Sequence, residues 1–405
     1  MDKLIILLLF LTLLLNPIKS NDSQCSIDST ESCLQKNVKT SSKLSIKDID
    51  NKYKKFYEAI NNAEDNYQEC ELKKCGCFKN VINNDLKTFK KDGISEKLIE
   101  QSRQRGTIYQ IINGSLYRSK DCMFPSRCAG VEYFIKKIIN NMTNIEFVLN
   151  TRDYPQSNKI FGQSLPIFSF SKTLEYFDIM YPAWSFWEGG PAISLYPRGL
   201  GRWDQHRKSL NNAADNNEWN NKIDKAFFRG SRTSDERDNL VYLSRNKPDL
   251  VDAQYTKNQA WKSDKDTLGR PPSSEVSLED HCKYKYLFNY RGVAASFRHK
   301  HLFLCNSLVF HVGDEWLEFY YESMKPWIHY IPVEKNASQD ELEDLITFAK
   351  ENYSISKKIA QRGRDFIWYK LRMADVTCYW KSLLKKYSKL LTYQVKLRPD
   401  LIKLT

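Results

Sequence analysis

The chain has 405 residues, of which 41% are hydrophobic and 13% aromatic. A chain of this length and apolar content can bury the cores of two ordinary domains, and its composition excludes a disordered protein. The formal net charge of +13 would suit a nucleic-acid binder, but the charges are scattered and do not form blocks. We therefore expect no nucleic-acid partner, and a solvated basic surface with a pocket for an anionic ligand.

The first 20 residues, MDKLIILLLFLTLLLNPIKS, are typical of a secretory signal peptide. Lys3 supplies the positive charge, the run from Leu4 to Leu15 is apolar, and Ser20 is small enough for the cleavage point. A membrane anchor is the alternative, but this run is shorter than the ~20 apolar residues that a span needs. We expect no transmembrane anchor, and a mature protein in the lumen of the endoplasmic reticulum or outside the cell.

Ten cysteines are present, and in an oxidising compartment we expect them to form disulfides. A zinc site is the competing interpretation of CELKKCGC, but no second Cys/His pair follows at zinc-finger spacing. We therefore predict no metal site. The Asn-x-Ser/Thr motifs agree with a secretory route and give five candidate N-glycosylation sites, which are Asn21, Asn113, Asn141, Asn336 and Asn352.

Helix patterns come first along the chain, over residues 45–68 and from Ser95, and strand and helix patterns alternate after them. Strands are predicted in NIEFVLNTRDYP, LPIFSFSK, KAFFRGS, DLVDAQYTK, SLVFHVG and WIHYIPV. A capping box of Ser338 and Glu341 begins a later helix, and two further helices close the chain. This alternation predicts an α/β fold with parallel sheets.

A polar stretch within residues 205–222, QHRKSLNNAADNNEWNN, indicates a boundary between two domains. We expect a flexible lead-in over residues 21–45 after the signal peptide. A first domain would cover residues 46–210 and a second 211–375, with a C-terminal helix and tail over 376–405.

Polar clusters follow three of the strand patterns: TRDYP, RGSRTSDER and NYRGVAASFR. Ligands of doubly wound domains bind at the carboxyl ends of strands, so these clusters are candidate sites. In NYRGVAASFR, Gly292 allows a tight turn, and Val293–Phe297 would offer the free N–H groups of a helix start to an anion. Arg298 would reach the same oxygens. A helix that merely begins at a glycine, with an exposed arginine, is the alternative.

The cluster RGSRTSDER is a second candidate site for an anion at a strand end. Ser231 and Thr233 are hydroxyl donors at a strand end, and Arg237 falls one helical turn after Thr233. Thr233 and Glu236 also fit a capping box, which is the purely structural role. Two basic helix starts on neighbouring strands would neutralise a leaving diphosphate without a metal ion.

Asp153 follows the buried strand of NIEFVLNTRDYP, where a carboxylate can act as a general base with Arg152 nearby to hold its charge. The alternative is a strand-terminal Asp that caps a turn. The stretch over residues 181–204 is rich in aromatic residues, Gly and Pro. It would line a groove for a sugar or a peptide, or form a packed loop.

These motifs together resemble the protein O-glucosyltransferases of the Rumi type, in the KTEL-motif family related to fungal capsule-associated glycosyltransferases. The matching pieces include DCMFPSRC, RDYPQ, FWEGGPA, GLGRWD, FRGSRTS, YTKNQAWKS, RGVAASFR and SLVFHVGDEWLEF. The resemblance implies a GT-B fold of two Rossmann-like domains, with the C-terminal helix returning to the first. It also implies an inverting transfer, without a metal cofactor, of glucose from UDP-glucose to the serine of C-x-S-x-P/A-C in folded EGF-like repeats.

Individual roles are implied in the same way, and Asp153 would be the catalytic base. The donor-binding residues would be Tyr196, Ser231, Arg237, Val293, Ala294, Ala295, Ser296, Phe297 and Arg298. The acceptor-binding residues would be Met123, Phe124, Pro125, Ser126, Arg127, Ala192, Ile193, Ser194, Leu195, Tyr196 and Pro197. The disulfides would join Cys70 to Cys77, Cys75 to Cys378, Cys122 to Cys128 and Cys282 to Cys305.

Three features depart from this family. GGPAISLYP is one residue shorter than the family's stretch, and the chain ends in RPDLIKLT without a KDEL-type retrieval signal. Cys25 and Cys33 are additional, and we expect them to pair with each other. The alternatives are a UDP-xylose transferase, a transferase to another acceptor, and a lumenal lectin or chaperone that binds EGF-like repeats without catalysis. In each case we expect a monomer.

Overall fold

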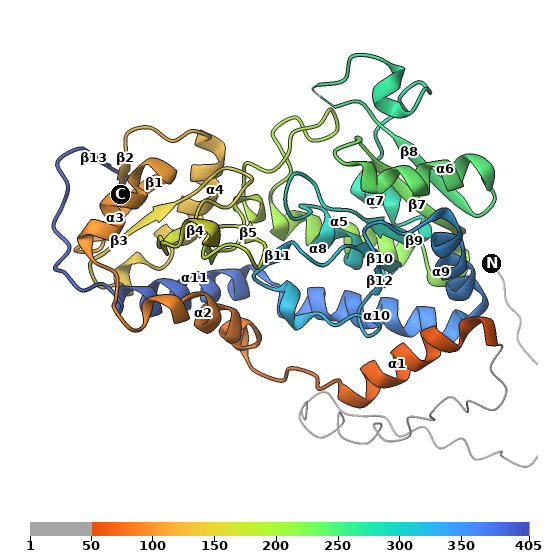
Figure 1. Cartoon of the computed structure of the whole chain (residues 1–405), viewed down its shortest axis with the longest axis horizontal. Helices are drawn as coiled ribbons and strands as arrows, with labels where there is room; N and C mark the ends of the chain where they lie inside the picture. Colours follow the sequence, from red (N-terminus) through yellow and green to blue (C-terminus); the bar gives the residue numbers. More distant parts are fainter. Residues whose placement is uncertain (1–50, 259, 405) are drawn as a thin grey trace, which may run out of the picture. The chain divides into compact units, whose positions relative to one another are not determined.

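The chain is divided into two units, residues 1–48 and residues 49–405. The computed structural model describes residues 51–258 and 260–404, which lie in the second unit (Figure 1). The predicted signal peptide, the lead-in, the Cys25–Cys33 pair and the glycosylation site at Asn21 lie outside the described residues. No helix in the described part is long and apolar enough to cross a membrane.

The first sheet has the strand order β13-β2-β1-β3-β4-β6. Its strands are β1 Thr107–Ile112, β2 Ser115–Ser119, β3 Ile145–Leu149, β4 Ile167–Ser169, β6 Ile179–Met180 and β13 Leu401–Lys403. β3, β4 and β6 are parallel, whereas β1 is antiparallel to β2 and β3. The antiparallel half arises because Asn113 and Gly114, both with positive φ, turn β1 tightly back into β2. This sheet is therefore mixed, and not parallel throughout as the sequence predicts.

The second sheet is parallel throughout, in the order β12-β10-β9-β7-β8. Its strands are β7 Ile223–Gly230, β8 Val251–Tyr255, β9 Tyr284–Asn289, β10 Leu308–Val312 and β12 Ile331–Val333. Taken in chain order, the strands run outward from β7 in both directions. The order therefore reverses between β7 and β9, and such a switch point is where doubly wound sheets bind ligands. Both sheets confirm the predicted α/β class.

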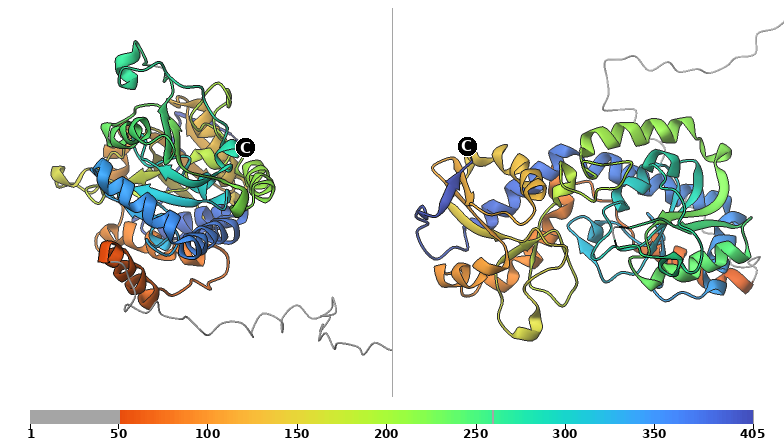
Figure 2. Two further views of the ribbon diagram at one scale, coloured as in Figure 1. Left: turned by 90° about the vertical axis from the view of Figure 1, so that its right-hand side faces the viewer. Right: turned by 90° about the horizontal axis from the view of Figure 1, so that it is seen from above.

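Helices cover both sheets. They are α1 Lys54–Asn66, α2 Lys79–Asp85, α3 Glu96–Ser102, α4 Pro125–Lys136, α5 Trp203–Asn216, α6 Asp238–Asn246, α7 Leu278–His281, α8 His299–Leu304, α9 Gln339–Glu351, α10 Tyr353–Lys370 and α11 Met373–Ser388. The Ser338–Glu341 capping box begins α9 as predicted. α10 packs against β10 and α8, whereas α11 packs against α4 and β3 (Figure 2). The last long helix therefore returns to the first sheet.

The polar stretch expected to be a domain boundary is helix α5. Trp203, Leu210 and Ala214 are buried on one face, with the helical spacing of an amphipathic element. The Trp203 indole donates to Leu371 O at 2.7 Å, and the Arg207 guanidinium donates to Ile367 O at 2.9 Å. The stretch is thus packed against the end of α10. A short ribbon of β5 Ser171–Lys172 and β11 Leu317–Glu318 also joins the two halves of the chain.

Four disulfides lie within the described residues, and they are the pairs that the resemblance implies: Cys70–Cys77, Cys75–Cys378, Cys122–Cys128 and Cys282–Cys305. Cys75–Cys378 fixes α11 beside the first segments of the chain. Of the glycosylation candidates, Asn113 and Asn336 are exposed. The Asn352 amide instead donates to Phe348 O at 2.9 Å and ends α9.

Candidate active site

Asp153 lies in a tight turn directly after β3. Buried Asn150 holds this turn, because its amide donates to Tyr154 O at 2.7 Å and to Ser169 Oγ at 3.0 Å. The Asn150 side-chain oxygen accepts from Arg152 N at 2.8 Å. The Asp153 side chain is left 37% exposed, so an incoming hydroxyl group can reach it. Sequence reasoning missed Asn150, although it stands directly before the TRDYP motif.

Arg127 is the cation beside Asp153, with Nη1 of the guanidinium 3.1 Å from Oδ1 of the carboxylate. The same nitrogen donates to Thr151 O at 2.6 Å, and the guanidinium lies 4.5 Å from the centre of the Trp184 ring. Arg152, the expected partner, instead donates to backbone and amide oxygens of neighbouring residues. The predicted Arg152–Asp153 pair is therefore wrong. It fails because consecutive side chains in this turn diverge.

Arg237 joins the loops that follow β7 and β9. It is 6% exposed and donates to Ser231 O, to Thr233 Oγ1 and to Arg291 O. The predicted capping box of Thr233 and Glu236 is absent, because Glu236 accepts a hydrogen bond from Arg291 at 2.8 Å. Arg237 thus ties together the two strand ends at the switch point of the second sheet.

The stretch Val293–Phe297 is a loop of bends, and helix α8 begins only at His299. The predicted row of helix-start N–H groups is therefore wrong, because Gly292 N bonds to Ala294 O at 2.9 Å in a tight turn. Val293 is exposed, and Ala294, Ala295 and Ser296 are buried. The ring of Phe297 stacks on Phe170 with centroids 5.0 Å apart.

Arg298 closes this loop, and its Nη1 donates to Arg229 O at 2.5 Å. Burial lowers the pKa of Arg298 to about 10, and burial with the nearby Arg298 charge lowers the pKa of Arg237 to about 10. Neither guanidinium has an ion-pair partner among the described residues. A buried cation beside a half-buried one, neither in an ion pair, is costly, so the switch point is suited to an anion.

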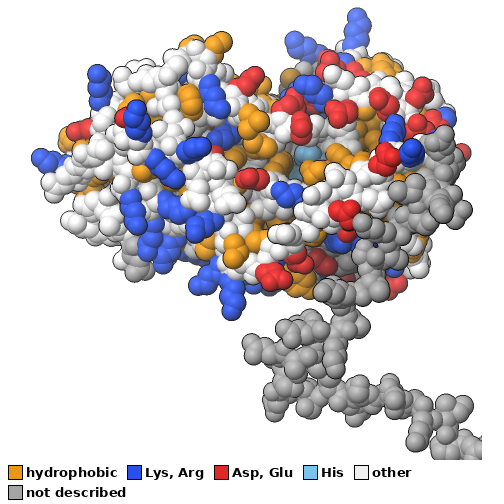
Figure 3. All heavy atoms as spheres, turned by 60° about the horizontal axis from the view of Figure 1, so that its bottom comes forward, with side chains coloured by type: hydrophobic (Ala, Val, Ile, Leu, Met, Phe, Trp, Pro, Cys, Tyr) orange, Lys and Arg blue, Asp and Glu red, His pale blue; other side chains and the backbone are white. Residues whose placement is uncertain are grey.

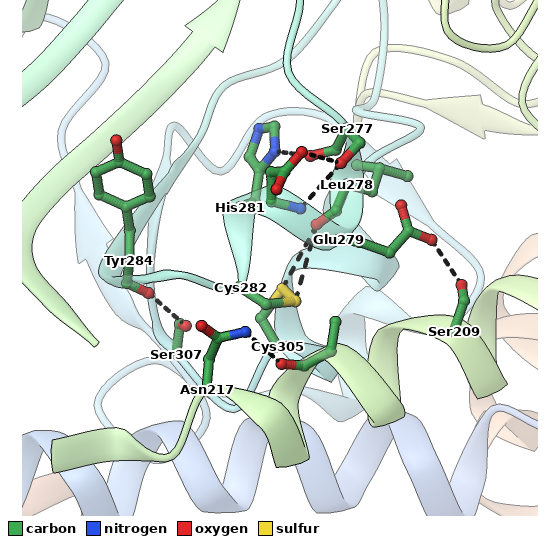
Figure 4. The surroundings of a disulfide bond; sticks show 12 residues. Ser209, Asn217, Ser277, Leu278, Glu279, His281, Cys282, Tyr284, Cys305 and Ser307 are labelled. Atoms are coloured by element: carbon green, nitrogen blue, oxygen red, sulfur yellow. Dashed lines mark hydrogen bonds between the residues drawn. A yellow bond between two sulfur atoms is a disulfide. The ribbon is translucent and has the colours of Figure 1, made fainter. Parts of the chain in front are cut away.

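Tyr196 is held by helix α7. Its hydroxyl accepts from Leu278 N at 3.0 Å and donates to Glu279 Oε2 at 3.3 Å, and burial raises the pKa of Tyr196 to about 12. Glu279 also accepts from Ser209 Oγ at 2.6 Å, as Figure 4 shows. The His206 imidazole, whose Nδ1 lies 3.9 Å from Glu279 Oε1, lowers the pKa of Glu279 to about 2 together with the hydrogen bond from Ser209.

The Cys282–Cys305 disulfide links the residue after α7 to the residue after α8 (Figure 4). α7 holds Tyr196, and α8 directly follows Arg298. The disulfide therefore links the helix that holds Tyr196 to the helix that follows Arg298, and both residues are candidate donor contacts. Sequence reasoning missed Glu279, whose only signal is its place three residues before Cys282.

The two candidate acceptor segments lie against each other at their bases. A Cβ atom at Gly189 would lie 2.7 Å from Arg127 N, and the φ of Gly189 is +82°, so only glycine fits there. Met123 is 57% and Leu195 45% exposed, as expected of residues that meet a partner. Ser194 Oγ donates to Glu275, which fastens the second segment to the chain before α7.

Two aromatic contacts connect the Asp153 turn and Arg127 to segments that follow β10 and β9 of the second sheet. The Tyr154 ring meets Trp316 edge-on with centroids 5.2 Å apart, and the Trp184 ring below Arg127 lies 5.7 Å from Phe297. A shallow pocket at the ends of β9 and β10 is lined by Trp316, Ser296 and neighbouring residues. The candidate base and the candidate donor loops thus border the same region. Within the described residues, no group of His, Cys, Asp and Glu could hold a metal ion.

Comparison with known proteins finds relatives that match most of the chain. The family model described as Glycosyl transferase family 90 matches residues 70–405. The O-glucosyltransferase rumi homolog of Aedes aegypti is 60% identical over 351 residues, or 86% of each chain. Protein O-glucosyltransferase 1 of Homo sapiens is 56% identical over 355 residues, covering 87% of this chain and 90% of its own. The solved structure of Anabaena HepE with UDP-glucose is 11% identical, with a TM-score of 0.32 over 45% of this chain and 53% of that one.

Proposed function

We propose that this chain, which belongs to glycosyl transferase family 90, is a protein O-glucosyltransferase that uses UDP-glucose. Its relatives at 60% and 56% identity carry that activity in their names and are matched over most of their length. The α/β fold with two sheets is of the GT-B type. The acceptor we propose is the serine of C-x-S-x-P/A-C in a folded EGF-like repeat.

One observation carries the proposal most directly. Asp153 is half-buried and accessible in the turn after β3, and the guanidinium groups of Arg237 and Arg298, without ion-pair partners, lie at the switch point of the second sheet. A base on one side and two cations without ion-pair partners on the other suit a reaction that takes a proton from a nucleophile and releases a diphosphate. A lectin or chaperone would need neither.

In the proposed reaction, the acceptor serine gives its proton to the Asp153 carboxylate as its oxygen attacks the anomeric carbon of glucose. The new carbon–oxygen bond forms opposite the bond to the diphosphate, so the configuration inverts. The electron pair of the broken bond leaves with UDP, whose extra charge Arg237 and Arg298 stabilise. General-base catalysis of this kind is worth about 10²–10⁴-fold in rate.

The remaining candidates keep the roles implied by the resemblance. Ser231, Tyr196 and Val293–Phe297 would line the UDP-sugar, and Met123–Arg127 with Ala192–Pro197 would receive the acceptor. Four disulfides and the candidate signal peptide support a lumenal or secreted protein.

Mass spectrometry of a purified EGF-like repeat tests the proposal. We expect a gain of one hexose from UDP-glucose on the folded repeat, and none on the reduced, unfolded repeat or after Ser→Ala in the acceptor motif. A gain of one pentose from UDP-xylose instead would make the protein a xylose transferase. UDP-sugar hydrolysis without a mass gain would mean another acceptor. A protein that binds the repeat but neither donor would be the lectin or chaperone.

The variant Asp153→Asn tests the base itself. We expect it to lose transfer by at least about 10²-fold and to bind UDP as the unchanged protein does in calorimetry. Asp92→Asn, at an exposed position, is the matched control and should transfer normally. Full activity of Asp153→Asn would contradict the assignment of the base.

A further inference from the structure

Lysines gather on one face of the molecule that the proposed reaction does not use. This lysine face consists of Lys79 on α2, Lys87, Lys90 and Lys91 in the segment after α2, Lys385 and Lys386 on α11, and Lys389 directly after α11. Figure 3, in which the underside of Figure 1 comes forward, shows basic side chains gathered over the part that carries these elements. Acidic side chains gather mainly on the other part of the view.

Three of these lysines converge on one place. Lys386 donates to Asn83 Oδ1 at 2.5 Å, which brings α11 beside α2. Lys79 stands one helical turn before Asn83 on α2, so α11 brings Lys386 to the face that carries Lys79. Burial and the charges of Lys79 and Lys90 lower the pKa of Lys386. Lys385 and Lys389 add a like-charged pair one helical turn apart. Repulsion of this kind is relieved when an anion binds.

Within the described residues no carboxylate forms an ion pair with these lysines, although exposed Asp92 directly follows Lys91 in the chain. The nearby carboxylate of Asp85 is buried against Lys172 at 2.5 Å. Lysines elsewhere do have partners, such as Lys335 with Glu315 and Lys358 with Glu64. Others, such as Lys208, Lys265 and Lys357, have no ion-pair partner among the described residues either, so what distinguishes the lysine face is the number of unpaired ammonium groups gathered there.

The chemistry of the face indicates the kind of anion. No large hydrophobic side chain is exposed on α2, on the segment after it or along residues 381–389. A protein interface is usually anchored by buried aromatic or apolar residues, and stable membrane binding needs an apolar contribution besides charge. The seven cations are all lysines, which lack the planar fork that arginine offers to carboxylates. These features favour a hydrated chain of single anionic groups, such as a sulfated polysaccharide.

We propose that the lysine face binds a linear sulfated polysaccharide, separately from the transfer of glucose. Sulfate groups repeated along such a chain would each meet one or two ammonium groups and release counterions. Binding would therefore weaken steeply with salt. The enzyme would thereby be held at sulfated surfaces while the region around Asp153 stays open to the acceptor.

Heparin provides the probe, with full-length protein and a titration at several NaCl concentrations. The triple variant Lys79→Gln, Lys90→Gln and Lys386→Gln should bind at least tenfold more weakly at 0.15 M NaCl, with a salt slope smaller by about two to three. The control Lys208→Gln, Lys265→Gln and Lys357→Gln removes the same charge at exposed positions elsewhere and should change binding less than threefold. Equal losses in the two variants would overturn the proposal, because binding would then follow net charge alone.

Two further binding experiments distinguish a sulfated polysaccharide from other anionic partners. Vesicles with anionic lipid, or polyglutamate of matched charge, should bind more weakly than heparin, and tighter binding of either would overturn the choice of a sulfated chain. Both triple variants should glucosylate an isolated EGF-like repeat at the normal rate, which shows that they fold. Because heparin binding requires no transferase activity, failure of the proposed function would leave this test intact.

Discussion

Nη1 of Arg127 lies 3.1 Å from Oδ1 of Asp153, and this ion pair joins a candidate acceptor segment to the candidate base. Arg127 belongs to the first turn of α4, which follows Cys122 of the Cys122–Cys128 disulfide. The stacked Trp184 ring and the Thr151 carbonyl fix the guanidinium from two further sides. Arg127 is therefore placed to orient the carboxylate of the base.

Arg127→Gln should lower kcat by about 10–100-fold, because the carboxylate loses its orientation and small misplacements are costly in catalysis. The KM for UDP-glucose should stay within about threefold, since Arg127 contacts neither donor loop. Steady-state kinetics with saturating EGF-like repeat measures both constants. Arg152→Gln is the matched control and should keep most of its activity, because Arg152 forms no pair with Asp153. A larger loss in Arg152→Gln would contradict this role for Arg127.

Arg237→Lys should raise the KM for UDP-glucose by about tenfold or more. A lysine carries its donors on one nitrogen and lacks the fork of the guanidinium, whose Nη1 and Nη2 separately reach Ser231 O and Arg291 O, so the two strand ends at the switch point would be held less firmly. Direct calorimetry with UDP should show the same loss of affinity. Arg245→Lys makes a fair control, because Arg245 likewise donates to two backbone carbonyls, Thr267 O and Leu268 O. If both variants lost UDP affinity equally, the tie between β7 and β9 would not be the cause.

Removal of the Cys282–Cys305 bridge by Ala at both positions should lower the free energy of unfolding by about 3 kcal/mol, the value for a closed loop of this length. It should also weaken UDP binding, because α7 and α8 lose their link. Urea unfolding and UDP calorimetry give the two values. A variant that is less stable yet binds UDP normally would show that the disulfide supports only the fold.

Much of the second sheet could be predicted from the sequence, because its strands are short apolar runs whose polar ends carry the motifs. The predicted strand KAFFRGS lies largely in β7, and the predicted strand SLVFHVG contains β10. Helix α5 was missed because its polar surface conceals a narrow buried stripe, although Trp203 and Leu210 lie seven residues apart. That spacing is the signal that a helix and not a linker was present.

The contacts between distant segments could not be predicted. Arg127 and Asp153 come from different elements of the fold. The sequence favoured Arg152 as the partner of Asp153 because Arg152 directly precedes it. The helix expected over Val293–Phe297 failed because the turn at Gly292 bonds to Ala294 and delays α8 to His299. Both errors concern backbone turns whose direction depends on tertiary partners and not on local propensity.

His329 should make the protein sensitive to acid. It is 2% exposed, its Nδ1 accepts from Lys325 N at 2.8 Å, and Nε2 lies 3.3 Å from the Tyr67 hydroxyl. Burial lowers the pKa of His329 to about 4, with smaller effects of the charges of Arg362 and Lys325. The unfolded chain has the ordinary pKa of about 6.5, so it binds the proton more readily than the folded chain.

The stability that neutral His329 contributes is thus complete above about pH 6.5 and is lost as the pH falls toward 4. The loss between pH 7 and pH 4 should be about 3 kcal/mol. His329→Asn keeps an acceptor for Lys325 N but cannot take up the proton, so its stability should fall less over this range. Urea unfolding at both pH values measures the difference between the two proteins. Parallel curves would show that His329 does not titrate on unfolding, and another group would then cause the acid sensitivity.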